Sequence, residues 1–390
     1  MTGELNDEMV ASLTPEILRL QDEDRLPICV YINSPGGNPR SAEALLNLLR
    51  LSDQDGAEPC RIITAVTVQA ASAAADLLAS GDYAIAFPQS TILHHGLRQL
   101  SGAPSTLEST GRLNELLRIS NSIYAMQLAK RTEDRFTFRF YSVRIDFPSV
   151  REAKGDPNLS DYECFVHVIQ EKLSPDARKI FEKAVTRAER YKALITSVTT
   201  NPGLAEAETP LQIQAAIIKA IVDFELSIQS SSDAQGFQFA GMRRLADDFY
   251  LLNEYQIGSN NQKLDEWCKT LGRLFITPEQ KAEIDGIADE DERLNRLAEI
   301  NRPILQPMLS FFIALCHALQ EGENELTAAD AYWLGLVDEV VGDDELGNLR
   351  LVYEFEDDEL EVEEPDGEEN TSAHAGGEGT KNAGTGAGTS

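Results

Sequence analysis

The first third of the chain alternates short apolar runs with amphipathic stretches. Residues 28–32 (ICVYI) are apolar and β-branched, as expected of a strand buried on both faces. The turn-forming residues 33–37 (NSPGG) follow, and Asn38 and Pro39 then suit the cap and first position of a helix rich in leucine. This pattern predicts a strand, a glycine turn and a helix.

The alternation continues beyond residue 60. Residues 61–68 (RIITAVTV) predict a second strand that runs into residues 69–78, whose small side chains favour a closely packed helix start. Residues 83–87 and 90–95 predict two short strands, and a helix is expected after Ser105. Strand and helix signals in alternation are typical of an α/β layer fold.

The pattern changes between residues 132 and 302, where longer and more polar segments have mostly helical spacing. We interpret this region as an inserted helical subdomain with a strand near residues 136–143. Residues 303–320 carry no formal charge and resemble a membrane span, but two prolines and three polar residues interrupt them. We therefore predict a buried helix there.

The α/β pattern returns in residues 326–340 (LTAADAYWLGLVDEV), after which the chain becomes acidic and then glycine-rich. Residues 354–369 hold 11 acidic residues and no basic one, a composition that favours disorder. The sequence therefore predicts a core in two parts, residues 1–131 and 303–346. Residues 132–302 form an insertion between these parts, and residues 347–390 form a disordered tail.

Charge and composition exclude several classes of function. The formal net charge of -31 argues against capture of nucleic acid or an anionic membrane, since both need a positive surface. The five cysteines form no CxxC pair, and the polar start lacks the apolar run of a secretion signal. We expect a cytoplasmic protein. No phosphate loop, metal-ligand cluster or dinucleotide fingerprint occurs in the sequence, so no cofactor is expected.

Three elements have the chemistry of a hydrolytic site. The glycines of residues 33–37 allow backbone amides to turn toward a ligand, which would form a site for an oxyanion. The alternative is an ordinary turn between strand and helix. Ser72 follows a strand at a helix start, where N–H groups suit developing negative charge. Its hydroxyl needs a neighbouring base. His94 and His95 lie on a predicted strand, and alternation lets only one of them face Ser72.

In combination and in this order, four segments resemble the proteolytic subunit of the Clp protease, within the ClpP/crotonase superfamily. They are VYINSPGG (30–37), QAAS (69–72), SGDYAIAFPQSTILHH (80–95) and LTAADAYWLGLVDEV (326–340). The resemblance covers roughly 170 of the 390 residues in two blocks. It implies an α/β fold, a spiral of β-β-α units, with the helical subdomain inserted into it.

The resemblance implies a role for each matched residue. It makes Ser72 the nucleophile and His95 the general base, with the backbone amides of Gly37 and Ala73 as oxyanion donors. The implied reaction is acyl transfer to water: the histidine accepts the serine proton and the amides stabilise the tetrahedral oxyanion.

The sequence departs from the family at Val68 and Ala73, where the family usually has Gly and Met, and at two acidic positions. Where the family has the aspartate of its triad, a few residues before the last helix, this chain has Glu323, and Glu325 is a rival because it is so near. A glutamate can still orient the imidazole. Asp76 stands where the family has an apolar residue, and we expect it to be exposed or hydrogen-bonded.

We expect a serine endopeptidase that acts on polypeptides and forms a homo-oligomeric ring, without nucleic-acid or membrane partners. The resemblance also implies an AAA+ unfoldase as partner. This sequence starts after the axial segment to which such a partner docks in the family, so this partner is not expected if Met1 is the true start. The insertion follows the helix that packs ring against ring in the family, so two stacked rings are not assumed. The alternative is a catalytically inactive scaffold on the same fold, and acyl-CoA chemistry of the crotonase type is a third reading.

Overall fold

A mixed β-sheet holds the elements that carry the candidate residues. The computed structural model describes residues 1–23, 26–51, 59–98, 106–231 and 262–347, and residues 1–350 form one compact unit. The predicted tail lies outside the described residues from residue 348 onward. Within the described ranges the sheet has six strands: β1 (Ile28–Ser34), β2 (Ile62–Ala71), β3 (Tyr83–Ala86), β4 (Thr91–His95), β5 (Glu323–Thr327) and β6 (Glu339–Val340).

Strand β2 is the centre of this sheet. It pairs in parallel with β1 along one side, and with β3 and then β4 along the other. Strand β6 joins β3 in parallel, whereas β5 joins β4 antiparallel. The strand β2 extends to Ala71, beyond the predicted end at residue 68, because Gln69, Ala70 and Ala71 pair with β4.

The prediction that residues 28–32 are buried on both faces was wrong. Residues of β1 alternate between buried and exposed positions, and Tyr31 is 57% exposed while Ile32 is fully buried. The turn after β1 leads into α2 as predicted: the Asn38 side chain accepts a hydrogen bond of 3.0 Å from the Arg40 amide, and Pro39 is the first helical residue.

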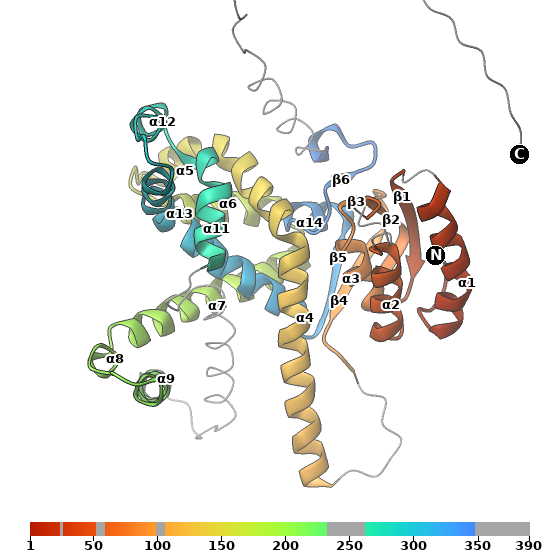
Figure 1. Cartoon of the computed structure of the whole chain (residues 1–390), viewed down its shortest axis with the longest axis horizontal. Helices are drawn as coiled ribbons and strands as arrows, with labels where there is room; N and C mark the ends of the chain where they lie inside the picture. Colours follow the sequence, from red (N-terminus) through yellow and green to blue (C-terminus); the bar gives the residue numbers. More distant parts are fainter. Residues whose placement is uncertain (24–25, 52–58, 99–105, 232–261, 348–390) are drawn as a thin grey trace, which may run out of the picture. The chain divides into compact units, whose positions relative to one another are not determined.

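Helices α1 (Asp7–Glu23), α2 (Pro39–Leu49) and α3 (Ala73–Ala79) accompany the sheet, and α4 (Leu107–Ser142) lies between this layer and the inserted helices (Figure 1). The predicted strand near residues 136–143 was wrong, because these residues continue α4 and the short η1 (Val143–Asp146). Phe136 and Phe140 lie one helical turn apart and are buried. The ring of Phe136 stacks on Phe312 at 4.4 Å, so aromatic packing outweighs local strand propensity.

The described residues between 132 and 302 are otherwise mostly helical, as predicted. Residues 131 and 302, the predicted boundaries, lie inside α4 and α13, and both helices run without a break from the insertion into the core. The inserted elements are α5 (Phe147–Lys154), α6 (Asp161–Lys172), α7 (Pro175–Thr199), α8 (Pro202–Ala205), α9 (Pro210–Ser231), α11 (Gln262–Thr270), η2 (Gly272–Phe275), α12 (Pro278–Asp285) and α13 (Glu290–Leu319).

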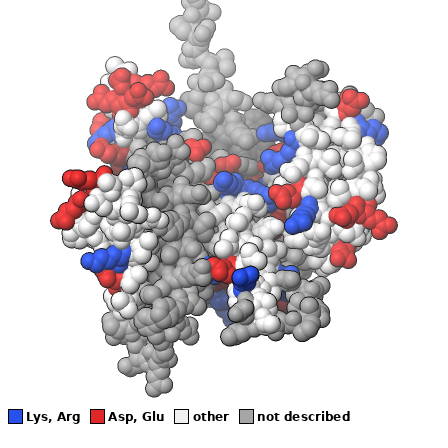
Figure 2. Space-filling model, turned by 60° about the horizontal axis from the view of Figure 1, so that its bottom comes forward, with Lys and Arg blue, Asp and Glu red and all other residues white. Residues whose placement is uncertain are grey.

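Helix α13 confirms the predicted buried helix. It has the length and apolar composition of a membrane-crossing helix, but 72% of its apolar 18-residue window is buried inside the structure. It ends just before β5, which α14 (Ala328–Trp333), β6 and η3 (Asp344–Leu346) follow. On the face shown in Figure 2, Lys and Arg side chains are interspersed with Asp and Glu rather than gathered into one basic surface.

A buried ion pair joins α4 to the segment between α14 and β6. Arg135 Nε lies 2.7 Å from Asp338 Oδ2, and both side chains are 2% exposed. Arg135 also donates to the carbonyl oxygens of Ala79 and Gly81, and Asp338 accepts the Ala84 amide. The Arg135 guanidinium therefore joins α4, the end of α3 and the residue that precedes β6, which fixes the position of α3 in the core.

Candidate active site

Ser72 lies in a strained turn between β2 and α3. Its φ is 56° and its ψ is -129°, and it is the one residue other than glycine with a positive φ in the described part of the chain. Such a conformation costs a residue with a side chain about 1–3 kcal/mol. The Ser72 hydroxyl makes no capping hydrogen bond to α3, although the residue is at the N-cap. The turn thus presents a hydroxyl at a helix N-terminus without using it for helix stability.

The glycine turn after β1 is pressed against Ser72. A Cβ atom added to Gly36 would overlap the Ala71 carbonyl oxygen and lie 2.6 Å from Ser72 Cβ, and Gly36 itself has a φ of 93°. A Cβ atom on Gly37 would collide with the backbone of Leu5. Only glycine fits at both places, so the turn is held between Leu5 and the serine.

The two predicted oxyanion donors have free amides. The Leu5 amide donates to the Gly36 carbonyl oxygen and the Asn38 amide donates to the Leu5 carbonyl oxygen, each at 2.7 Å, which fixes the chain around Gly37. Neither the Gly37 N–H nor the Ala73 N–H donates a hydrogen bond to any described residue. Ala73 begins α3, where the first amides have no partner within the helix. Both amides can therefore receive a ligand oxygen.

His95 ends the strand beside β2. Ala71 pairs with Leu93, and the Ser72 amide donates to the Leu93 carbonyl oxygen at 2.8 Å, so Ser72 and His95 both lie at the carboxyl ends of neighbouring parallel strands. His95 is partly exposed, whereas His94 is 1% exposed. Among the described residues no hydrogen bond joins the Ser72 hydroxyl to His95, whose Nδ1 lies 2.6 Å from the Gly96 carbonyl oxygen.

Glu323 lies directly opposite His95 in the antiparallel pair of β4 and β5, whereas Glu325 lies opposite Leu93. Register therefore favours Glu323 as the partner of the imidazole. Its carboxylate is ion-paired with Arg98 instead, and both side chains are more than half exposed. The structure brings the predicted acid beside the base but does not join the two.

A cavity of about 610 Å³ lies along β5. The size suits a ligand-binding pocket. Helix α7 forms its other wall with Lys179 and Lys183, and Asp330 fastens the start of that helix by accepting from the Ser174 amide and hydroxyl, each at 2.8 Å. By strand alternation, the cavity-lining residues on the His95 face are Thr91, Glu323, Glu325 and Thr327.

Two titratable residues, Asp76 and His94, lie close together on the elements that carry Ser72 and His95. This contact was not predicted from the sequence. Asp76 of α3 and His94 of β4 approach to 3.7 Å between Oδ1 and Nδ1. Asp76 is hydrogen-bonded, one of the two expected outcomes, through Gln320; its Oδ1 has no hydrogen-bond partner, and 20% of its side chain is exposed. One feature of the sequence could have pointed to this contact: Asp76 is the single charged residue in the otherwise apolar helix AAADLLA.

Burial governs the ionisation of this pair. It raises the pKa of Asp76 to about 6, against opposing effects of the Arg131 guanidinium and a hydrogen bond from Gln320. Burial, and then the charge on His95, lower the pKa of His94 to about 4. At neutral pH the pair therefore holds one negative charge, on Asp76.

No metal site accompanies these residues: in the described ranges no group of three or more His, Cys, Asp or Glu side chains could hold a metal ion.

Comparison with known proteins identifies similarity to one protein family and its members. A sequence model of the Clp protease family matches residues 1–154. The chain is also 30% identical over 155 residues to the ATP-dependent Clp protease proteolytic subunit of Pleurastrum terricola, an alignment that covers 39% of this chain and 76% of that protein. The family match includes the glycine turn, Ser72 and His95, and it ends before β5.

The backbone strain at Ser72 predicts an unusual order of stability. Ser72→Ala keeps the strain and Ser72→Gly relieves it, while glycine loses about 0.5–1 kcal/mol through its greater freedom in the unfolded chain. We expect Ser72→Gly to be more stable than Ser72→Ala by about 1 kcal/mol in denaturant unfolding. Equal stabilities, or a more stable alanine variant, would mean that the turn is not strained.

Proposed function

The chain belongs to the Clp protease family, and on that premise we propose that it hydrolyses peptide bonds as a serine endopeptidase. In this proposal Ser72 is the nucleophile and His95 the general base, and the amides of Gly37 and Ala73 form the oxyanion hole. The observation that carries the proposal is the backbone of Ser72: the positive φ falls on the residue that the family pattern assigns as nucleophile. A strained strand-to-helix turn is a known way to present a nucleophilic hydroxyl.

The reaction follows from these assignments. His95 accepts the Ser72 proton while the serine oxygen attacks the peptide carbonyl carbon, and the carbonyl oxygen becomes an oxyanion. The free amides of Gly37 and Ala73 donate to that oxygen. Loss of one such donor typically costs about 100- to 1,000-fold in rate. The histidine then gives its proton to the leaving amine, and water hydrolyses the acyl-enzyme by the same steps.

In this proposal the Glu323 carboxylate exchanges Arg98 for His95 before the reaction. The cross-strand position of Glu323 supports this step, because the two side chains lie opposite each other on one face. An exposed ion pair such as Arg98–Glu323 contributes about 0–1 kcal/mol, so its loss is a small cost.

Members of the Clp protease family form oligomeric rings and work with unfoldases, and we propose that this chain also assembles with copies of itself. On α4, Leu116, Ile119 and Ile123 are 62%, 43% and 48% exposed at helical spacing, which leaves an apolar stripe open. Sedimentation velocity of the wild type and of Leu116→Asp tests this proposal. The variant should sediment as smaller species, and identical profiles would exclude this stripe as the surface through which copies of the chain assemble.

We expect a fluorophosphonate probe to label the wild-type protein at Ser72 and to leave Ser72→Ala unlabelled. His95→Gln should slow labelling by about 100- to 10,000-fold, because the hydroxyl loses its base. Mass spectrometry of the modified peptide gives both the site and the rate. His167→Gln is the matched control, since His167 is a partly exposed histidine of α6 outside the site. A folded but unlabelled wild type would favour the catalytically inactive scaffold.

The choice between the two glutamates has its own test. Glu323→Gln should slow labelling at least about tenfold, because the base loses the carboxylate that orients it. Glu325→Gln should stay within about twofold, since Glu325 lies opposite Leu93. The same labelling rates serve as the measurement. If Glu325→Gln is the slower variant, the assignment of the acid is reversed.

A further inference from the structure

The buried Asp76–His94 pair joins the two elements that carry the proposed catalytic residues. Asp76 is one helical turn after Ser72 on α3, and His94 directly precedes His95 on β4. Strand alternation turns His94 inward, to the side opposite His95. The 3.7 Å approach of Asp76 Oδ1 to His94 Nδ1 is therefore a link between helix and strand beneath the site.

The pair is also poorly satisfied for a buried polar group. Asp76 Oδ1 and His94 Nε2 are both buried without a hydrogen-bond partner. An unpaired buried polar atom destabilises the folded state, and apolar residues often replace a buried charged pair without loss of stability. Stability alone thus gives no reason for this pair, and perturbed titratable groups of this kind cluster at functional sites.

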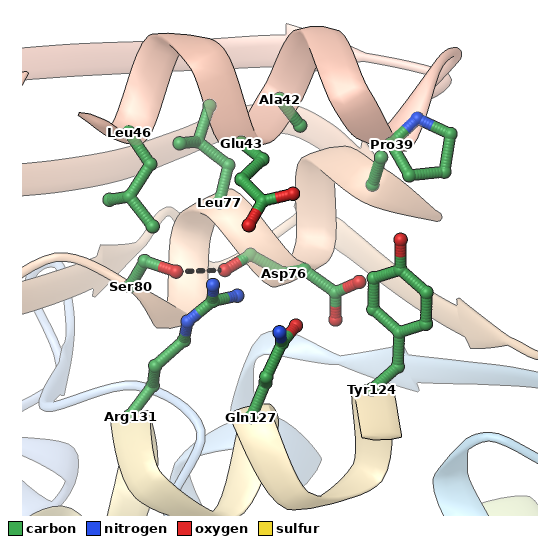
Figure 3. Close-up of a pocket in the computed structure, with 11 residues that line it drawn as sticks. Pro39, Ala42, Glu43, Leu46, Asp76, Leu77, Ser80, Tyr124, Gln127 and Arg131 are labelled. Carbon is green, nitrogen blue, oxygen red and sulfur yellow. Dashed lines mark hydrogen bonds between the residues drawn. The ribbon is translucent and has the colours of Figure 1, made fainter. Parts of the chain in front are cut away.

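Charged and titratable groups face Asp76 from three elements. Helix α4 contributes Arg131 and Tyr124, α2 contributes Glu43 and β4 contributes His94. Figure 3 shows the α4 side chains rising toward α3 around a cavity of about 20 Å³, with the Asp76 carboxylate beside Tyr124. Arg131 is the cation among them. It favours the ionised carboxylate, and Asp76 in turn favours the charged guanidinium.

We propose that Asp76 and His94 are positioning residues for Ser72 and His95, and that the site is competent only while the pair carries its negative charge. With Asp76 ionised, attraction to the Arg131 guanidinium holds α3 against α4, and Asp76 stays in contact with His94 of β4. Uptake of one proton removes that attraction and loosens the placement of the nucleophile relative to the base. This inference rests on the proposed function, since it concerns the reactivity of Ser72.

The negative charge on Asp76, which favours reactivity in this proposal, lowers the folding stability of the protein. The pKa of Asp76 is raised in the folded chain, to about 6 from 3.8, so between these values the folded state binds the proton and the unfolded state does not. The ionised carboxylate therefore costs folding stability in full above about pH 6, and the cost disappears below about pH 4. A variant that cannot ionise should be more stable at neutral pH and yet less reactive.

Asp76→Asn tests the proposal, because asparagine resembles the protonated carboxyl in shape and charge. At about pH 8 we expect this variant to unfold at higher denaturant concentration than the wild type, while fluorophosphonate labelling of Ser72 slows about 10- to 100-fold. At about pH 4 the two unfolding curves should coincide. His94→Asn, which removes the other member of the pair, should also slow labelling. Glu43→Gln is the control from the same cavity and should change neither quantity.

The pH profile separates positioning from simple structural support. Protonation of Asp76 near pH 6 adds one proton-dependent loss of reactivity to the wild type, so its plot of log rate against pH should be steeper by 1 at lower pH than that of Asp76→Asn. Labelling of Asp76→Asn at the wild-type rate and slope would overturn this inference and leave the proposed function standing. A wild type that is unlabelled at every pH would overturn both.

Discussion

The approach of the Gly36 backbone to Ser72 is the constraint on which the candidate site depends. No side chain fits at Gly36, and the serine adopts a conformation that residues with a Cβ atom avoid. The strain persists because neighbouring structure holds it: the Ser72 amide is bonded to β4, and the glycine turn is bonded to Leu5. The free amides of Gly37 and Ala73 result from the same geometry, because one flanks the turn and the other begins the helix.

The insertion leaves that geometry intact because it enters and leaves the core along continuous helices. Helix α4 carries Arg135, which fastens α3 and Asp338, before it continues into the inserted helices. Helix α13 returns the chain to β5, where Glu323 pairs with His95 across the strands. The insertion also reaches the site itself, since Asp330 anchors α7 beside the cavity along β5. The added helices thus form one wall next to the proposed acid, which is a place for them to influence substrate choice.

Local sequence was enough to predict strands β1 to β4, the glycine turn and the helix cap at Asn38, because each depends on neighbouring residues. It failed where distant packing decides: residues 136–143 read as a strand but are helical, since Phe136 packs on Phe312 of α13. The prediction of Ser72 and His95 as a catalytic pair came from matched motifs and stays a prediction. The Arg98–Glu323 pair and the burial of Asp76 against His94 could not be predicted, because both join residues from elements whose contact the sequence does not state.

In the proposed site Ser72, His95 and the amides of Gly37 and Ala73 converge on one reacting carbonyl. A crystal structure of the protein with a peptide boronate measures this convergence directly. We expect a covalent bond from Ser72 Oγ to boron, with one boronate oxygen within hydrogen-bond distance of both amides and the His95 imidazole beside the serine oxygen. A boronate bound elsewhere, or bonded to Ser72 with its oxygens turned away from Gly37 and Ala73, would contradict it.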